Sequence, residues 1–166
     1  MPERQRFGLT RPSSWVLPLY AGTMFLSAFL LFAVQPMFIK MVLPLLGGAP
    51  AVWNTAMVFF QAMLFAGYLY AYLGIRLLGL RRQALLHTVV LLLPLVVLPI
   101  TVAEGWLPSA SSQQIPWLLA LLGVSVGLPF FVVSSTAPLL QSWFAQTGHP
   151  SADDPYFLYG SSNLGS

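Results

Sequence analysis

Hydrophobic residues occur in four long stretches that contain no Asp, Glu, Lys or Arg. These charge-free stretches cover residues 12–39, 41–75, 83–103 and 105–152. A transmembrane helix needs about 20 mostly apolar residues to cross roughly 30 Å of hydrocarbon, so each stretch has room for one crossing. The last stretch begins with a polar segment, 108–114, ahead of its apolar part. The pattern predicts four transmembrane helices, near 15–38, 51–75, 84–103 and 116–140.

The predicted fold class is an all-α polytopic integral membrane protein. No segment alternates apolar and polar residues with the period of two that a barrel strand requires. We expect a cytoplasmic tail over 1–14 and one transmembrane helical domain over 15–166. The segment from Tyr156 to Ser166 reads as the start of a truncated fifth helix, because eleven helical residues cover only about 16 Å. An interfacial tail on the cytoplasmic surface is the alternative interpretation of this segment.

Composition narrows the class of protein further. Of the 166 residues, 57% are hydrophobic and 7% are charged, whereas an ordinary soluble domain carries about 25% charged residues. This excludes a soluble enzyme, and the high hydrophobicity excludes a disordered chain. The chain has no cysteine, which removes disulfides, thiolate metal sites and cysteine nucleophiles.

The basic residues predict the orientation in the membrane. Six of the seven precede the first helix or lie between the second and third: Arg4, Arg6, Arg11, Arg76, Arg81 and Arg82. With four alternating helices these six share one side, and the opposite side has only Lys40 and Glu104. The positive-inside pattern therefore predicts a cytoplasmic N-terminus. The apolar core over 15–33 is too long for a usual cleaved signal peptide, and no basic stripe with interleaved aromatics indicates a nucleic-acid partner.

Three polar residues recur every seven positions along the second helix. Asn54, Gln61 and Tyr68 share one helical face, and lipid offers them no hydrogen-bond partner. The row forms one wall of a polar cavity in one interpretation. In the other it makes interhelical hydrogen bonds.

Lys40 is the single basic residue on the outer side, shortly after the helix-weakening Pro36. Near a helix end its side chain can snorkel to water. The more specific hypothesis is that Lys40 binds an anion at the entrance of a ligand-binding site.

The third and fourth helices carry weaker signals. His87 is a lone histidine without the further ligands that a metal site needs, so an interhelical hydrogen-bonding role is favoured. Gly123 and Gly127 form a small-residue motif that suits helix packing, either internal or between chains. The hydroxyls of Ser134-Ser-Thr136 precede Pro138 and can bond carbonyls that the proline leaves unpaired.

Several blocks together resemble one family. The most distinctive is LSAFLLFAVQPMFIKMVLPLLGG over 26–48. The others are PAVWNT at 50–55, FFQ at 59–61, GY at 67–68, LPFF at 128–131, APLLQ at 137–141, DPYFLY at 154–159 and SNLG at 162–165. In this order they are similar to the N-terminal membrane region of bacterial fused major-facilitator/spermidine-synthase-like proteins.

The resemblance implies a region of the bacterial inner membrane that is followed by a cytosolic aminopropyltransferase-like domain. This sequence has no glycine-rich nucleotide loop and no catalytic carboxylate pair, so we expect no enzymatic activity, cofactor or metal in this chain. The expected function is a non-catalytic module that tethers or supplies such a cytosolic domain. Its expected partners are the lipid bilayer, a downstream synthase-like domain and other helices. The alternatives are a partial transporter of polyamines or metabolites and a helical assembly partner without a ligand.

Overall fold

The computed structural model describes residues 14–46, 48–100, 113–147, 149–152 and 156–166. The regular secondary structure of these residues is helical throughout. Three helical stretches are long and apolar enough to cross a membrane: Val16–Leu46, Pro50–Val96 and Gln114–Phe144. The prediction of an all-helical chain with membrane-type helices is therefore confirmed.

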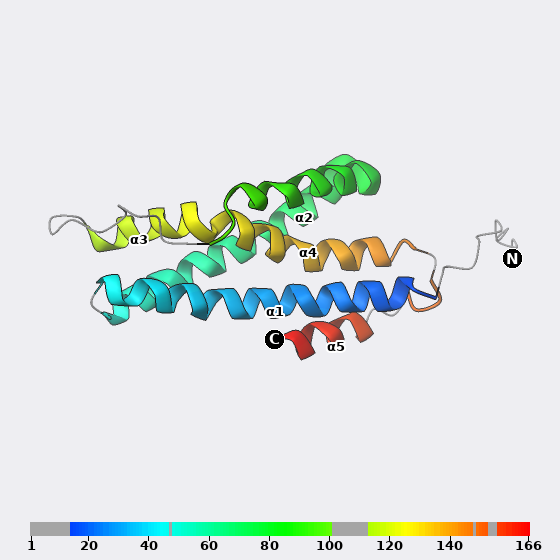
Figure 1. Ribbon diagram of the computed structural model, residues 1–166. Helices are drawn as coiled ribbons and strands as arrows, with labels where there is room; N and C mark the ends of the chain where they lie inside the picture. Colours follow the sequence, from blue (N-terminus) through cyan, green and yellow to red (C-terminus); the bar gives the residue numbers. More distant parts are fainter. Residues whose placement is uncertain (1–13, 47, 101–112, 148, 153–155) are drawn as a thin grey trace, which may run out of the picture.

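The helices lie side by side in an elongated bundle (Figure 1). Helix α1 (Val16–Val42) continues into the 3₁₀ turn η1 (Leu43–Leu46), and α2 (Pro50–Leu92) continues into η2 (Leu93–Val96). Helix α3 (Gln114–Leu122) joins α4 (Leu128–Phe144) through the π-helical segment η3 (Gly123–Gly127). The short helix α5 (Tyr156–Gly165) returns along α1.

Helix α2 reverses direction at Gly79. The backbone there has φ 73° and ψ 166°, a conformation that glycine adopts without the steric cost of a side chain. In one straight helix, Tyr70 and His87 would be about 25 Å apart, yet their ring centroids are 5.9 Å apart. Helix α2 is thus a hairpin with a first limb over 50–78 and a second limb over 80–92.

The helix boundaries differ from the predicted ones where prolines occur. The α-helix of the second limb ends at Leu92 and becomes 3₁₀ around Pro94, whereas the sequence pattern predicted helix over 84–103. Residues 101–103 lie outside the described residues. Proline lacks the N–H that an α-helix needs, and here it coincides with the helix end. Pro36, by contrast, lies inside α1, which runs on to Val42.

The α3–α4 stretch lies at the centre of the packing. In its most apolar window 56% of residues are buried, against 17% for the window in Pro50–Val96. One core cluster joins the end of α1, the start of α2 and α3 around Phe38, Phe60 and Leu122. A second cluster joins the start of α1, the end of α4 and α5 around Met24 and Phe144.

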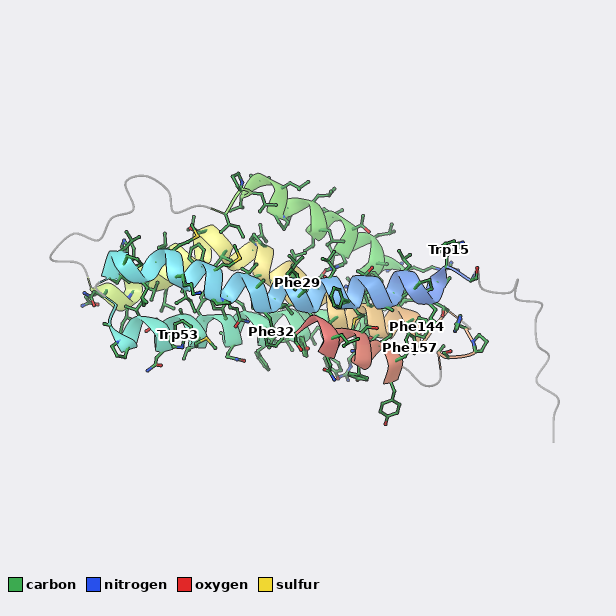
Figure 2. All side chains as sticks on the ribbon, turned by 60° about the horizontal axis from the view of Figure 1, so that its bottom comes forward. Trp15, Phe29, Phe32, Trp53, Phe144 and Phe157 are labelled. Atoms are coloured by element: carbon green, nitrogen blue, oxygen red, sulfur yellow. The ribbon has the colours of Figure 1, made fainter. Side chains whose placement is uncertain are left out.

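Large apolar side chains cover the outside of the bundle. Figure 2 shows Trp15, Phe29, Phe32 and Trp53 projecting outward, and Phe32 is 58% exposed. Soluble monomers rarely expose apolar patches of this extent. The surface has the character that contact with lipid or with other apolar helices requires.

Helices α2 and α4 approach each other closely at Gly67. A Cβ at this position would collide with Ser134 Oγ and lie 3.0 Å from the Ser135 backbone nitrogen. Ser134 Oγ also donates to the Met63 carbonyl at 3.4 Å, across the same interface. A small residue on α2 therefore sets how closely α2 and α4 pack.

Candidate functional site

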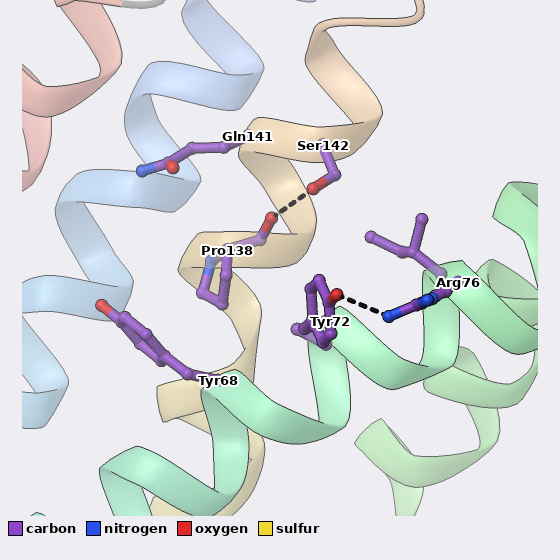
Figure 3. A pocket seen from close by; sticks show the side chains of 8 residues that line it. Tyr68, Tyr72, Arg76, Pro138, Gln141 and Ser142 are labelled. Atoms are coloured by element: carbon purple, nitrogen blue, oxygen red, sulfur yellow. Dashed lines mark hydrogen bonds between the residues drawn. The ribbon is translucent and has the colours of Figure 1, made fainter.

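A groove of about 500 Å³ runs between the first limb of α2 and α4 near the Gly79 turn (Figure 3). Its walls come from both helices. They are Tyr68, Ala71, Tyr72, Ile75 and Arg76 from α2, and Pro138, Gln141 and Ser142 from α4. The groove combines one cation, two phenols, an amide and a hydroxyl.

Arg76 is held against the groove by the residue one turn earlier. Its Nη1 donates to the Tyr72 hydroxyl at 2.9 Å, and its guanidinium carbon lies 5.9 Å from the centre of the Tyr72 ring. The acidic residues of the chain all lie outside the described residues. A guanidinium has five N–H donors in a fork that suits carboxylate or phosphate, so the groove can accept an anionic group at this end.

The predicted polar row is not brought together at this groove. Tyr68 lines the groove and is 50% exposed. Asn54 and Gln61 are exposed on the outside of α2, farther toward its start. The row therefore lies on the outer surface of the described chain and does not line an enclosed cavity within it.

The other predicted site residues are dispersed. Lys40 is exposed in the last turn of α1, where a positive charge interacts favourably with the helix dipole, and it is not part of the groove wall. Gly123 is exposed, and a Cβ there would have nothing within 4 Å. Gly127 is buried, and a Cβ there would lie 3.5 Å from Phe59 Cζ. Only Gly127 of the pair faces α2.

The hydroxyls ahead of Pro138 do bond backbone carbonyls of their own helix. Ser134 donates to the Phe131 carbonyl at 2.8 Å, and Ser135 and Thr136 donate to the Val132 carbonyl at 2.9 Å. These carbonyls belong to the preceding turn. Pro138 leaves the carbonyl of Ser134, four residues earlier, without an N–H partner. None of these three hydroxyls bonds that carbonyl, so the prediction was wrong on this point.

A second polar feature, which we call the buried polar cluster, lies between the two limbs of α2 and α4. It consists of Tyr70, Gln83, His87 and Trp143. The His87 ring centroid is 5.9 Å from those of Tyr70 and Trp143. Gln83 lies one turn before His87 and against Gly74, where a Cβ would be 2.9 Å from Gln83 Cγ. Gln83 and His87 are 0% and 1% exposed.

The polar atoms of this cluster have no hydrogen-bond partner within the described residues. They are the Tyr70 hydroxyl, both amide atoms of Gln83, both ring nitrogens of His87 and Nε1 of Trp143. The Gln83 amide approaches the Tyr70 hydroxyl without reaching hydrogen-bond geometry. The predicted interhelical position of His87 is present, since its ring contacts α4, but the predicted hydrogen bond is not formed.

The sequence pattern did not predict that Gln83 is buried, because Gln83 follows the basic residues of the turn, where an exposed side chain is expected. One signal was available. Gln83 and His87 are four residues apart and so share a helical face. Gly67 was missed because the contact depends on α4, which the spacing of α2 does not reveal.

Comparison with known protein families, curated proteins and solved structures found no match to this chain. In the described residues, no group of three or more His, Asp or Glu side chains lies close enough together to hold a metal ion.

Proposed function

We propose that the chain is a four-span, non-catalytic membrane module of a fused major-facilitator/spermidine-synthase-like protein, with its N-terminus in the cytoplasm. In this role it tethers or supplies a cytosolic domain. The observation that carries the topology is the reversal at Gly79 beside Arg76, Arg81 and Arg82. The family assignment rests on the sequence blocks described above.

The reversal supports two crossings within Pro50–Val96. As one straight helix these 47 residues would extend about 70 Å, roughly twice the hydrocarbon thickness. The hairpin instead places the start of α1 and the Gly79 turn at the same end of the bundle (Figure 1). Basic residues at that end favour the cytoplasmic side.

Single cysteines in this cysteine-free chain test the topology directly. Arg82→Cys and Gln146→Cys should react with a membrane-impermeant maleimide only in inverted vesicles. Lys40→Cys and Gln113→Cys should react in intact cells, because they lie at the other end of the bundle. All four side chains are exposed. Labelling of Arg82→Cys and Gln113→Cys from the same side would reduce the count to three spans and remove the proposal.

The tethering role is tested by fractionation. Co-expression with a soluble aminopropyltransferase-like domain from the same genome should move that domain into the membrane pellet. Arg81→Glu with Arg82→Glu should return it to the supernatant, while Lys40→Glu at the opposite end should not. A domain that stays soluble beside a correctly inserted chain would contradict tethering.

A second candidate function, a partial small-molecule transporter, is favoured by the groove beside Arg76. The groove wall offers a cation and neutral groups, which suits an anionic or neutral metabolite better than a polyamine. Succinate, sulfate and spermidine can be compared by the Tm of the detergent-purified protein. We expect an anion to raise Tm, Arg76→Gln to abolish the increase and Arg82→Gln to retain it. A shift with spermidine alone would contradict the anionic preference.

A further inference from the structure

The exposed face of the first limb of α2 carries a continuous row of side chains, which we call the exposed seam. Its members are Asn54, Val58, Gln61, Phe65, Tyr68 and Tyr72. The steps between them alternate between four and three residues, the spacing with which two helices pack in a left-handed crossing. Val58, Phe65 and Tyr72 are 68%, 69% and 58% exposed, so the described residues leave this face open.

The seam combines two kinds of side chain at regular positions. Asn54, Gln61 and Tyr68 alternate with Val58 and Phe65, and the row ends at Tyr72, whose hydroxyl accepts a hydrogen bond from Arg76. Lipid cannot hydrogen-bond the amides. Contact with water would be unfavourable for the apolar side chains of Val58 and Phe65. A transmembrane helix with polar groups at matching depths satisfies both sets, because membrane helices associate through packing and interhelical hydrogen bonds.

We propose that the exposed seam is the interface of a parallel homodimer, in which the first limb of α2 packs against the same limb of a second copy. A two-fold axis along the membrane normal brings each residue to the same depth as its own copy. A carboxamide has both donors and acceptors, so Asn54 and Gln61 are each self-complementary. No charged residue lies between 54 and 72, so the seam itself brings no like charges together. The nearest charge is Arg76, one turn after Tyr72, where it donates to the Tyr72 hydroxyl.

This inference rests on the membrane placement in the proposed function, and the experiment separates the two. The full chain is expressed in bacterial membranes with single cysteines, and disulfide formation is induced with copper phenanthroline. Val58→Cys, Phe65→Cys and Tyr72→Cys lie on the seam and leave Asn54 and Gln61 in place. Leu73→Cys is the matched control, since Leu73 is also exposed on the first limb, at 39%, but about 100° around the helix from the seam.

We expect a disulfide-linked dimer from the three seam variants, at several times the yield of Leu73→Cys. Adding Gln61→Leu to Phe65→Cys should lower the yield about threefold, and Gln61→Asn should retain most of it. Equal yields at Leu73→Cys, or no homodimer from any seam variant, would overturn the proposal. A cross-link to a different protein would also overturn it, because another helix would then occupy the seam.

The maleimide labelling of Arg82→Cys and Gln113→Cys is measured in the same membranes. Opposite-sided labelling without a seam cross-link removes the homodimer and leaves the four-span topology. Same-sided labelling removes the proposed topology whatever the cross-link yield.

Discussion

The first limb of α2 has polar groups on both of its faces, but their surroundings differ. On the packed face, the Tyr70 hydroxyl is closed in with Gln83 and His87 against α4, without a partner in the described residues. On the opposite face, Asn54 and Gln61 project outward beside exposed aromatic residues. In a water-soluble helix, the polar residues would gather on the exposed face and apolar ones on the packed face.

For a helix that crosses a membrane, as we propose for α2, the difference shows what determines the packed face. Lipid is as apolar as leucine, so hydrophobicity does not select the face that packs. The small residues Gly67 and Gly74 do select it, because they allow α4 and the second limb to approach. An outward polar residue then indicates contact with something other than lipid.

The largest loss of stability is expected for a larger side chain at Gly67, where the packed face of α2 leaves no space for it. Gly67→Leu places a side chain where even a Cβ collides with Ser134 and Ser135. Overpacking of this kind costs about 1–3 kcal/mol and occasionally more, and we expect the upper end because backbone must move. The measurement is the SDS-unfolding midpoint in mixed micelles. Gly123→Ala is the control, since a Cβ there meets nothing within 4 Å, and equal midpoints for the two variants would contradict the packing.

The second prediction concerns the buried polar cluster. Gln83→Met keeps the length of the side chain and removes two buried polar atoms that have no described partner. Because an unsatisfied buried polar group costs about 1–3 kcal/mol, we expect the variant to be more stable by about 1–2 kcal/mol in the same unfolding assay. A loss of stability would mean that the amide has a partner, with bound water or the Tyr70 hydroxyl as the nearest choices. Leu85→Met, an exposed change on the same limb, should leave the midpoint nearly unchanged.

The sequence predicted the helices of this fold better than their contacts. Gaps between charges located the helical stretches, because the cost of a charge in hydrocarbon acts on each segment separately. The reversal was predicted as a connection between two alternating helices, marked by Arg76, Arg81 and Arg82, but its position at Gly79 was not. The cluster of Tyr70, Gln83, His87 and Trp143 depends on how three segments pack. Nothing in the spacing of any one segment specifies that arrangement.

The third prediction tests the turn that separates the two limbs. Gly79→Ala places a side chain on a backbone with φ 73° and ψ 166°, an essentially glycine-only region that costs other residues about 1–3 kcal/mol. A Cβ at Gly79 would meet no other part of the chain within 4 Å, so the loss comes from the local backbone conformation and not from packing against a neighbouring element. We expect destabilisation within this range, with Gly123→Ala as the unaffected reference. A neutral Gly79→Ala would mean that the turn is not fixed in this conformation.

The smallest effect is expected on the exposed face, and it should appear in a different measurement. Gln61 is exposed and has no described partner, so Gln61→Leu should change the free energy of unfolding of the dilute monomer by less than about 0.5 kcal/mol. The same change should weaken self-association by about 0.6 kcal/mol, the average strength of an interhelical hydrogen bond in a membrane. Förster transfer between labelled copies in lipid vesicles, titrated with the lipid-to-protein ratio, measures that association. Gln83→Met should do the reverse, shifting unfolding and leaving association unchanged. If both variants shifted the same measurement, the two faces of α2 would not differ as the structure describes, and the polar residues on the outward face would belong to the internal packing.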